Sequence, residues 1–293
     1  VDFLSTVRRE DVKNVREWMK EYRHLPMAEH GFSMLVRVSD GSKVHNILFD
    51  TGGSSNGVVV NARRMGIDLS KIECIVLSHG HYDHFAGLPA VVKAVGKNGL
   101  PVIVHEDMFK TRGVANPDGT IRSYPRFPSE KKIAPARYIE AKQPSLIADG
   151  LILVTGEIPR KTSFEKGFPR HRALMGGVWQ PDPWIWDDRA LVIHVKRKGL
   201  IILSGCAHAG IVNTTLYARQ LTGVETVHAV LGGFHLAGEV SEPRINQTVH
   251  ELEKMNPKLL APSHCTGWRG IYAIANSMPK AFVWNSVGNL YVF

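Results

Sequence analysis

The sequence predicts a layered α/β protein, in which mixed sheets lie face to face and helices cover their outer sides. Strand-like and helical stretches alternate through the last third of the chain, which is typical of α/β layers. Candidate hairpins near both ends argue against a purely parallel sheet. With 293 residues, of which 44% are hydrophobic, the chain can bury a large core, and we expect a single domain over residues 1–293.

The first third of the chain is predicted to begin with a helix and then to form a hairpin. Apolar residues recur at helical spacing over residues 11–22. Residues 33–38 and 44–49 are strand-like runs on either side of Asp40-Gly41, a dipeptide typical of hairpin turns. The further predicted elements are a helix at 56–65, a strand at 72–77, a helix at 88–95 and a strand at 101–105.

Two segments in the middle of the chain are predicted to be loop-rich insertions. Prolines interrupt residues 109–147, and residues 156–188 are again irregular. Three tryptophans in the second insertion could line a pocket for a flat substrate, cover a sheet edge or form a subunit contact; they are Trp179, Trp184 and Trp186. Strands are predicted at 151–155, 190–195, 200–203, 227–231, 259–262, 281–284 and 290–293, and helices at 213–221, 245–255 and 271–276.

Charge and composition restrict the partners. A formal charge of +9 favours a small anionic substrate, with phosphorylated molecules among the candidates, although a merely basic surface explains it equally well. Nucleic acid is possible but not specifically indicated, because no basic tract with interleaved aromatic residues is present. No apolar run approaches the roughly 20 residues of a membrane span. Three scattered cysteines favour a cytoplasmic location, and the start at Val1 leaves open whether a targeting peptide was removed.

Several separate loops carry side chains that can bind metals. The six residues from His79 to His84 contain three histidines and one aspartate, directly after the predicted strand at 72–77. A single histidine in such a loop is more often structural than a ligand, but several strand ends of the same character favour a metal centre. Neighbouring glycines allow sharp turns that bring these side chains together. The other strand-end candidates are Asp50, Cys206, His208, His235 and His264.

Residues 79–84 resemble the His-x-His-x-Asp-His signature of the metallo-β-lactamase fold superfamily, and residues 50–52 are similar to the Asp-Thr-Gly turn that precedes it. The resemblance covers residues 33–293 and implies an αββα sandwich with two mixed sheets, outer helices and two metals at one edge. One branch is more similar. It contains dihydropterin-ribofuranosylaminobenzene-phosphate synthases of methanopterin biosynthesis and many uncharacterised hydrolases. The segments similar to this branch are 29–31, 155–160, 205–213, 232–236 and 264–267.

The resemblance implies a division of ligands between two divalent metals. His79, His81 and a later histidine would hold the first metal. The second would be held by Asp83, His84 and His264. Zinc is the metal we expect. Iron also suits imidazole, and the carboxylate makes the second site tolerant of manganese or magnesium.

Cys206 departs from the usual pattern of the superfamily. Many members have an aspartate at this position, and that aspartate bridges both metals. Either the Cys206 thiolate is a ligand, or Cys206 is only a small buried residue and His208 completes the first site. Glu157 lies near the position at which other superfamily members have a further histidine ligand, and it is a second candidate to complete the first site.

The resemblance also implies roles beyond metal binding. Two metals would lower the pKa of a shared water, which Asp83 could orient. His235 could protonate the leaving group, or it could be a hydrogen-bonded turn residue. Asp50 is expected to accept the free ring N–H of a ligand histidine. Arg160 and Lys161 are candidates for binding a phosphate or carboxylate of the substrate, with a solvated basic loop as the equal alternative.

These features favour a dinuclear metal-dependent hydrolase that acts on a small anionic ester, lactone, lactam or phosphodiester through a metal-bound hydroxide. The first alternative is a transferase that joins a pterin-methyl pyrophosphate to an aminobenzene ribofuranosyl phosphate. An RNA-processing nuclease is a second alternative, although no long basic arm to grip RNA is evident. A non-catalytic binding protein is disfavoured because the set of metal ligands is complete. The oligomeric state is left open.

Overall fold

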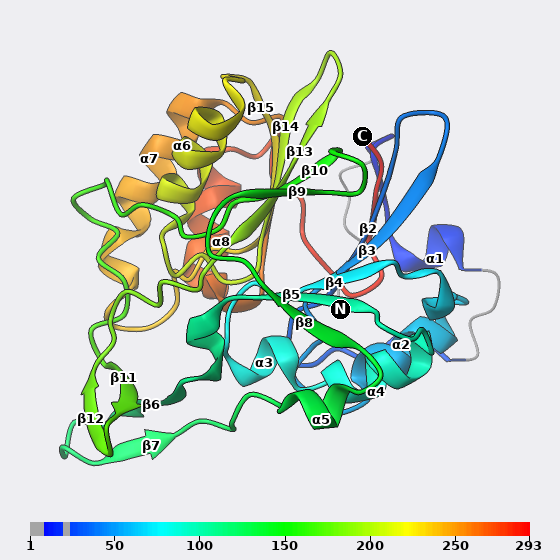
Figure 1. The fold of residues 1–293 in the computed structure, drawn as a ribbon. Coiled ribbons are helices and arrows are strands. Elements are labelled where there is room, and N and C mark those ends of the chain that lie inside the picture. The colour runs from blue at the N-terminus through cyan, green and yellow to red at the C-terminus, as the bar shows by residue number, and fades with distance from the viewer. Residues whose placement is uncertain (1–8, 20–23) are drawn as a thin grey trace.

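Two mixed sheets form the centre of the molecule. The computed structural model describes residues 9–19 and 24–293. The two sheets face each other, and helices lie against their outer sides (Figure 1). The arrangement confirms the predicted layered α/β fold, an αββα sandwich with outer helices. Placing the whole of residues 1–293 in one domain stays a prediction.

The first sheet has five strands and contains the predicted hairpin. Its order is β2 (Met34–Ser39), β3 (Val44–Phe49), β4 (Cys74–Val76), β5 (Pro101–Val104) and β8 (Arg137–Glu140). β2 and β3 are antiparallel, whereas β3, β4, β5 and β8 run parallel. The carboxyl ends of β3 and β4 therefore lie at the same edge of the sheet.

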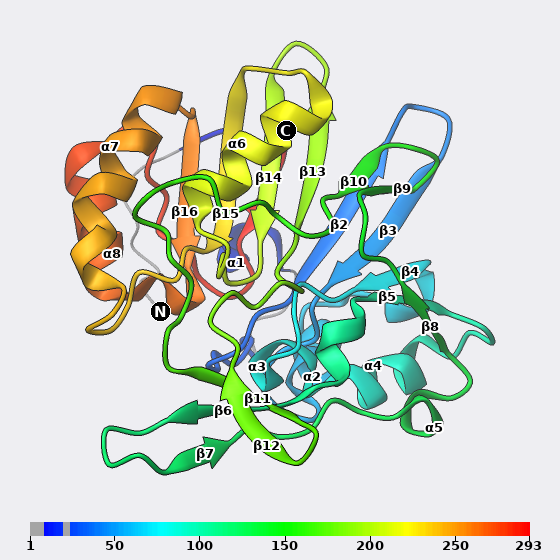
Figure 2. The same cartoon turned by 60° about the vertical axis from the view of Figure 1, so that its left-hand side comes forward.

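The second sheet has six strands. Its order is β16 (Leu259–Ser263), β15 (Val227–Gly233), β14 (Gly199–Ser204), β13 (Ala190–Val195), β10 (Ile152–Val154) and β9 (Ser145–Ile147). β14, β15 and β16 run parallel, and the remaining neighbours are antiparallel. The ends of the three parallel strands consequently meet at one edge (Figure 2).

Apolar side chains fill the space between the layers. Ile47 and Phe49 of one sheet pack in the same buried cluster as Leu203 and Leu231 of the other. Each such side chain contributes roughly 1.5–3 kcal/mol when it is fully removed from water. Helices α6 (Ile211–Thr222), α7 (Ile245–Met255) and α8 (Gly267–Ser277) cover the six-stranded sheet, and α2 (Gly57–Arg64), α4 (Leu88–Val95) and α5 (Glu130–Ile133) cover the other. Among the described residues, no helix has the length and apolar character needed to cross a membrane.

The amino-terminal helix is shorter than the periodicity predicts. Val12–Lys13 form strand β1, which pairs with β17 (Leu290–Tyr291) near the other end of the chain. Helix α1 (Val15–Trp18) then begins at Asn14, whose side chain accepts from the N–H of Arg16 while Glu17 closes a capping box. The last part of the predicted helix, residues 20–22, lies outside the described residues.

A small sheet joins the two segments for which the sequence predicts loops. Its order is β12 (Val178–Pro181), β11 (His171–Met175), β6 (Thr111–Ala115) and β7 (Ile121–Ser123). β6 and β7 come from residues 109–147, and β11 and β12 come from residues 156–188. The small sheet lies apart from the two large sheets, close to helix α3 (Tyr82–Phe85), in both views (Figures 1 and 2). Short strands between prolines gave no clear periodicity in the sequence.

Candidate metal centre

Metal-binding side chains meet where strands of the two large sheets end. Asp50 follows β3, the loop after β4 contains His79 and His81, and α3 contains Asp83 and His84. The facing sheet contributes side chains from the loops after its three parallel strands, namely Cys206, His208, His235 and His264. The structure thus brings together side chains that are far apart in the sequence.

Four residues in these loops adopt left-handed backbone conformations although they are not glycine. The φ angles are 61° at Asp50, 54° at Ala207, 46° at His235 and 51° at His264. Such conformations cost of the order of 1–3 kcal/mol each and persist only where the surroundings hold them. Four of the nine described non-glycine residues with such conformations lie at this one edge of the sandwich, which marks it as a candidate functional site.

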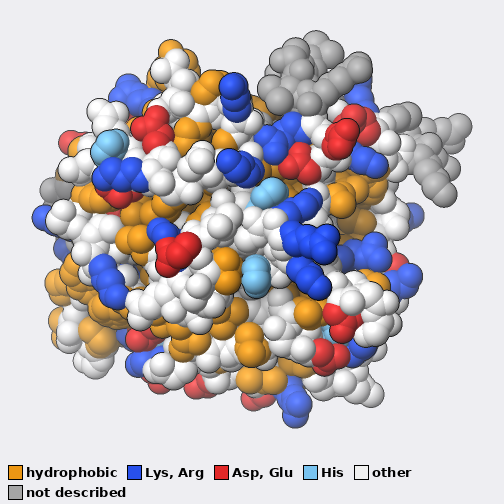
Figure 3. Space-filling model, turned by 90° about the horizontal axis from the view of Figure 1, so that it is seen from above, with side chains coloured by type: hydrophobic (Ala, Val, Ile, Leu, Met, Phe, Trp, Pro, Cys, Tyr) orange, Lys and Arg blue, Asp and Glu red, His pale blue; other side chains and the backbone are white. Residues whose placement is uncertain are grey.

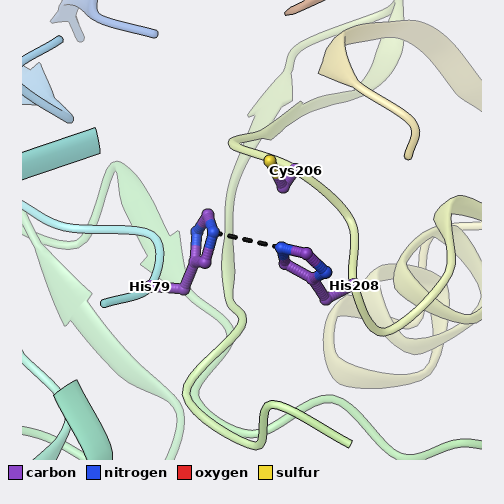
Figure 4. Close-up of side chains that lie close together, drawn as sticks. All are labelled: His79, Cys206 and His208. Atoms are coloured by element: carbon purple, nitrogen blue, oxygen red, sulfur yellow. Dashed lines mark hydrogen bonds between the residues drawn. The ribbon is translucent and has the colours of Figure 1, made fainter. Parts of the chain in front are cut away.

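The first group of donors is His79, His208 and Cys206 (Figure 4). The Nε2 atoms of His79 and His208 are 3.2 Å apart, and the dashed line in the figure joins them. His81 directs Nδ1 at the same Nε2 atom of His79, at 3.0 Å. All four side chains are buried. Three imidazole nitrogens and one sulfur could therefore surround a single metal.

The second group of donors is His84, His264 and Cys206. His84 Nε2 lies 3.1 Å from His264 Nε2 and 3.2 Å from the Cys206 sulfur. An Asp83 carboxylate oxygen lies 3.2 Å from His264 Nε2 and 3.9 Å from His84 Nε2. Cys206 belongs to both groups, so its sulfur lies between the two candidate metal positions.

Asp50 connects ligand candidates of both groups. Its carboxylate accepts the His84 Nδ1–H at 2.6 Å and the Ser78 hydroxyl at 2.7 Å. Ser78 Oγ in turn lies 2.9 Å from His79 Nδ1. The neighbouring Gly205 has to be glycine, because a Cβ there would overlap the Ser78 hydroxyl. Asp50 thus contacts His84 directly and His79 through Ser78, and it does not join either donor group. Its role as a support for metal-binding histidines stays a prediction.

The protonation of the histidines fits a metal centre. Burial and the neighbouring histidines lower the pKa of His79 and of His208 well below the ordinary value, so both rings are neutral. The Ser78 hydroxyl donates to Asp50 and can therefore only accept from His79 Nδ1–H, which leaves a lone pair on His79 Nε2. The separation of 3.2 Å to His208 Nε2 is close to the ~3.3 Å expected between two nitrogen ligands of tetrahedral zinc.

His84 and Asp83 differ electrostatically from the first group. Burial lowers the pKa of His84, but the Asp50 carboxylate outweighs this effect and raises it to about 9. Burial raises the pKa of Asp83, but the hydrogen bond to His264 and the charge of His84 bring it well below its usual range. Asp83 is thus an anion, and a metal bound at His84 would take the place of the proton on Nε2. Imidazole nitrogens together with the Asp83 carboxylate are ligands that suit a divalent cation.

His235 lies beside the first donor group. Its ring centroid is 4.2 Å from that of His208, and its Nδ1 is buried and has no hydrogen-bond partner among the described residues. It also forms a third group of donors with Cys206 and Cys265. Arg244 holds the loop by donating to the His235 carbonyl at 2.6 Å. The His235 ring therefore lies directly beside the first donor group.

Glu157, Arg160 and Lys161 lie outside the donor groups. Glu157 contacts His105 Nε2 at 3.1 Å and Lys142 at 3.2 Å. Arg160 donates to backbone carbonyls, including that of Trp184, and lies over the Trp186 ring with its guanidinium carbon 4.7 Å from the ring centroid. Lys161 Nζ donates to Gln220 Oε1 at 2.7 Å. Protein groups thus engage both cations in the structure, and their role in binding substrate stays a prediction.

Three residues at the site were not singled out from the sequence. His171 of β11 directs Nε2 at His81 Nε2, 3.0 Å away. Arg112 of β6 makes a paired contact with Asp187 at 2.7 and 2.5 Å, and Asp187 also accepts the Gly80 N–H at 2.7 Å. All three belong to, or lie next to, the small sheet. In the sequence, each of the three is a histidine or a charged residue in a short segment that also contains apolar residues, and such a pattern does not indicate a site.

The fold and the site define a class of protein. The model of the metallo-beta-lactamase superfamily matches residues 28–219, and the chain belongs to this superfamily. A similar protein is the 7,8-dihydropterin-6-methyl-4-(β-D-ribofuranosyl)-aminobenzene-5′-phosphate synthase of Methanocaldococcus jannaschii, which is 33% identical over 250 residues, covering 83% of this chain and 82% of the synthase. An uncharacterised protein of the same archaeon is 32% identical over 267 residues, covering 90% of this chain and 93% of its own length.

A solved structure shares the fold. It is that of a metal-dependent hydrolase of the β-lactamase superfamily, with a TM-score of 0.74 and 24% sequence identity. The match covers 92% of this chain and 94% of the hydrolase. The metallo-β-lactamase sandwich predicted from the sequence is thereby confirmed.

Proposed function

We propose that this protein is a metal-dependent hydrolase that acts on a small anionic ester, lactone, lactam or phosphodiester. The observation that carries the proposal is the pair of buried donor groups that share Cys206 at one edge of the sandwich. Two such sites a few ångströms apart are the arrangement in which both the attacking and the leaving oxygen can be stabilised. Superfamily membership supports the same conclusion.

The ligands we propose follow the two donor groups. His79 and His208 through Nε2, and His81 through Nδ1, would hold the first cation. The second would be held by Asp83, His84 and His264. Zinc is the cation we propose, and bound cations would supply Lewis acidity that activates water and stabilises developing negative charge. Cys206 would contribute a soft sulfur between them, which favours zinc or iron over magnesium at that position.

Asp83 and His235 would handle protons on either side of the reacting bond. The Asp83 side chain is 14% exposed, so it reaches the surface of the site, and its low pKa keeps it able to accept a hydrogen bond from the attacking water. His235 lies beside His208, with an Nδ1 atom that no described residue engages. That nitrogen could carry the proton that a leaving group requires.

A transferase of the pterin type is the second candidate. The observation that favours it is the identity of 33% to a pterin-pathway synthase over more than four fifths of both chains. In that reaction the amine nitrogen of the aminobenzene acceptor would bond to the pterin methyl carbon and lose a proton as pyrophosphate leaves. The same donor groups would then bind pyrophosphate oxygens through the metals.

A substrate panel separates the two candidates. Turnover of bis-aryl phosphodiesters, lactones or a chromogenic cephalosporin by the metal-loaded protein is expected for the hydrolase. Absence of hydrolysis, together with a pterin retained through purification or pyrophosphate release from a pterin-methyl pyrophosphate, would instead favour the transferase. An RNA-processing nuclease stays the weaker alternative. On the face shown in Figure 3, Lys and Arg side chains stand among acidic and apolar ones.

His81→Ala is expected to lose metal and turnover together while the fold is retained. The variant removes a nitrogen 3.0 Å from His79 Nε2. Substituting a residue that only hydrogen-bonds a metal ligand lowers metal affinity or activity by about 10–100-fold. Because His81 is a proposed ligand itself, we expect kcat/KM to fall by more than about a hundredfold. Elemental analysis, circular dichroism and the substrate panel measure the three properties. His194→Ala on the exposed side of β13 is the control, and full activity of His81→Ala would contradict the two-metal site.

His235→Asn is expected to slow substrates with poor leaving groups far more than activated ones. Asparagine tolerates the left-handed backbone at this position, so the variant tests the imidazole alone. General acids contribute about 10²–10⁴-fold. We expect about a hundredfold loss with an alkyl leaving group and less than about threefold with 4-nitrophenolate. Equal losses for both substrates would argue against a leaving-group acid.

A further inference from the structure

His171 reaches the metal centre from the small sheet. It is the first residue of β11, its side chain is fully buried, and its Nε2 lies 3.0 Å from His81 Nε2. Its other nitrogen, Nδ1, lies 2.8 Å from the backbone carbonyl oxygen of Asp182. His171 therefore lies between a candidate metal ligand and the backbone of the β11–β12 hairpin.

The carbonyl of Asp182 decides where the proton of His171 resides. A carbonyl oxygen can only accept, so His171 Nδ1 must carry a hydrogen and donate it. A neutral His171 ring then has a lone pair on Nε2, directed at His81. The hairpin fixes this geometry, because the Asp182 N–H donates back to the His171 carbonyl at 3.1 Å.

His81 lies between two nitrogen lone pairs. His79 Nε2 carries one, because Ser78 engages the Nδ1–H of that ring, and it lies 3.0 Å from His81 Nδ1. His171 Nε2 carries the other, 3.0 Å from His81 Nε2. A histidine that ligates a metal is neutral and has one ring hydrogen to give. His81 can thus satisfy only one of its two neighbours.

Only one placement of that hydrogen is compatible with a metal at His79. If His81 Nδ1 were protonated, its hydrogen would occupy the His79 lone pair, and His81 Nε2 would face the His171 lone pair without a hydrogen between them. If Nε2 is protonated, it donates to His171, and the lone pairs of His79 Nε2 and His81 Nδ1 both remain free. A hydrogen-bonded chain then runs from His81 through His171 to the Asp182 carbonyl.

We propose that His171 is a positioning residue that accepts the Nε2–H of His81 and so directs the His81 Nδ1 lone pair at the first metal. The proposal rests on the metal site of the proposed function. It also gives the small sheet a role beside this site. Asp187, paired with Arg112, accepts the Gly80 N–H at 2.7 Å, and His171 contacts the next residue, His81.

Two substitutions of His171 by residues with amide side chains test its two hydrogen bonds separately. In His171→Gln the side-chain oxygen can take the place of Nε2 and accept from His81. In His171→Asn the shorter amide can still donate to Asp182 but cannot reach His81. His45→Asn is the matched control, because His45 is also buried and hydrogen-bonded, but it contacts Glu73 and lies near the start of β3, at the opposite end of that strand from Asp50.

Cobalt binding to the metal-free protein is the measurement, read by titration calorimetry and by the visible spectrum of the bound ion. We expect His171→Asn to bind one of two cobalt ions 10–100-fold more weakly and with an altered spectrum. His171→Gln should recover most of the affinity, and His45→Asn should match the parent protein. Circular dichroism verifies that each variant is folded.

Two results would overturn the proposal. One is a His171→Asn protein with the affinity and spectrum of the parent, and the other is a His171→Gln protein as impaired as His171→Asn. Neither depends on catalysis. A parent protein that binds two cobalt ions but hydrolyses nothing would overturn the hydrolase alone, while the His171 comparison would still decide the positioning role.

Discussion

Asp50→Asn is expected to weaken the second metal site and to lower the free energy of unfolding by about 3–5 kcal/mol. The buried carboxylate accepts from the Ser78 N–H at 2.6 Å, the Ser78 hydroxyl at 2.7 Å and His84 Nδ1 at 2.6 Å. The amide has the same shape, but its NH2 group would face donors that need an acceptor. Urea unfolding and elemental analysis measure the two effects.

Asp149→Asn is the matched control for Asp50→Asn. Asp149 also has a left-handed backbone, with φ of 55°, but its side chain is 70% exposed and pairs with Lys43. Surface changes of this kind usually stay within about 0.5 kcal/mol. If both variants lost the same small amount of stability and Asp50→Asn kept both metals, Asp50 would not be the support that the geometry indicates.

Arg112→Met is expected to lower the free energy of unfolding by about 3–5 kcal/mol, because it leaves a buried carboxylate without its partner. Arg112 and Asp187 are 3% and 1% exposed, and two hydrogen bonds join them. Burial raises the pKa of Asp187, but Arg112 outweighs this effect and holds it below its usual range. Urea denaturation with a two-state fit measures the loss.

The double variant Arg112→Met with Asp187→Asn should recover at least about half of that loss. The charge is then gone, and the asparagine oxygen can still accept the Gly80 N–H. Arg269→Met removes an exposed pair with Glu242 and should cost at most about 1 kcal/mol. A single Arg112→Met variant as mild as this control would contradict the role of the buried pair.

The large sheets and the order of the donor loops could be predicted from the sequence because both depend on local patterns. Apolar runs end in short polar loops with glycine, and parallel strands place those loops at one edge. The structure accordingly brings His79, His84, Cys206, His208 and His264 together. Helix α7 has the predicted bounds, since a clear amphipathic period runs through it.

The small sheet and its contributions could not be predicted. Its strands have three to five residues each, and the pairing of β6 with β11, which joins the two hairpins, spans more than fifty positions of sequence, so no local period marks the sheet. The sequence indicates Arg160 as a candidate for binding substrate. In the structure its guanidinium donates hydrogen bonds to the backbone carbonyls of residues 184 and 185. Such contacts depend on tertiary packing, and a linear pattern does not contain them.

From the four left-handed residues at the strand ends we expect that the folded chain, and not the metal, positions the ligands. Asp50, His235 and His264 follow strands whose side chains belong to hydrophobic layers far larger than the site, and Ala207 is itself part of such a layer. A zinc finger unfolds without its ion because binding supplies its folding energy. Here we expect the protein to stay folded when a chelator removes the metals. Different metal ions could then bind to the same folded protein in turn.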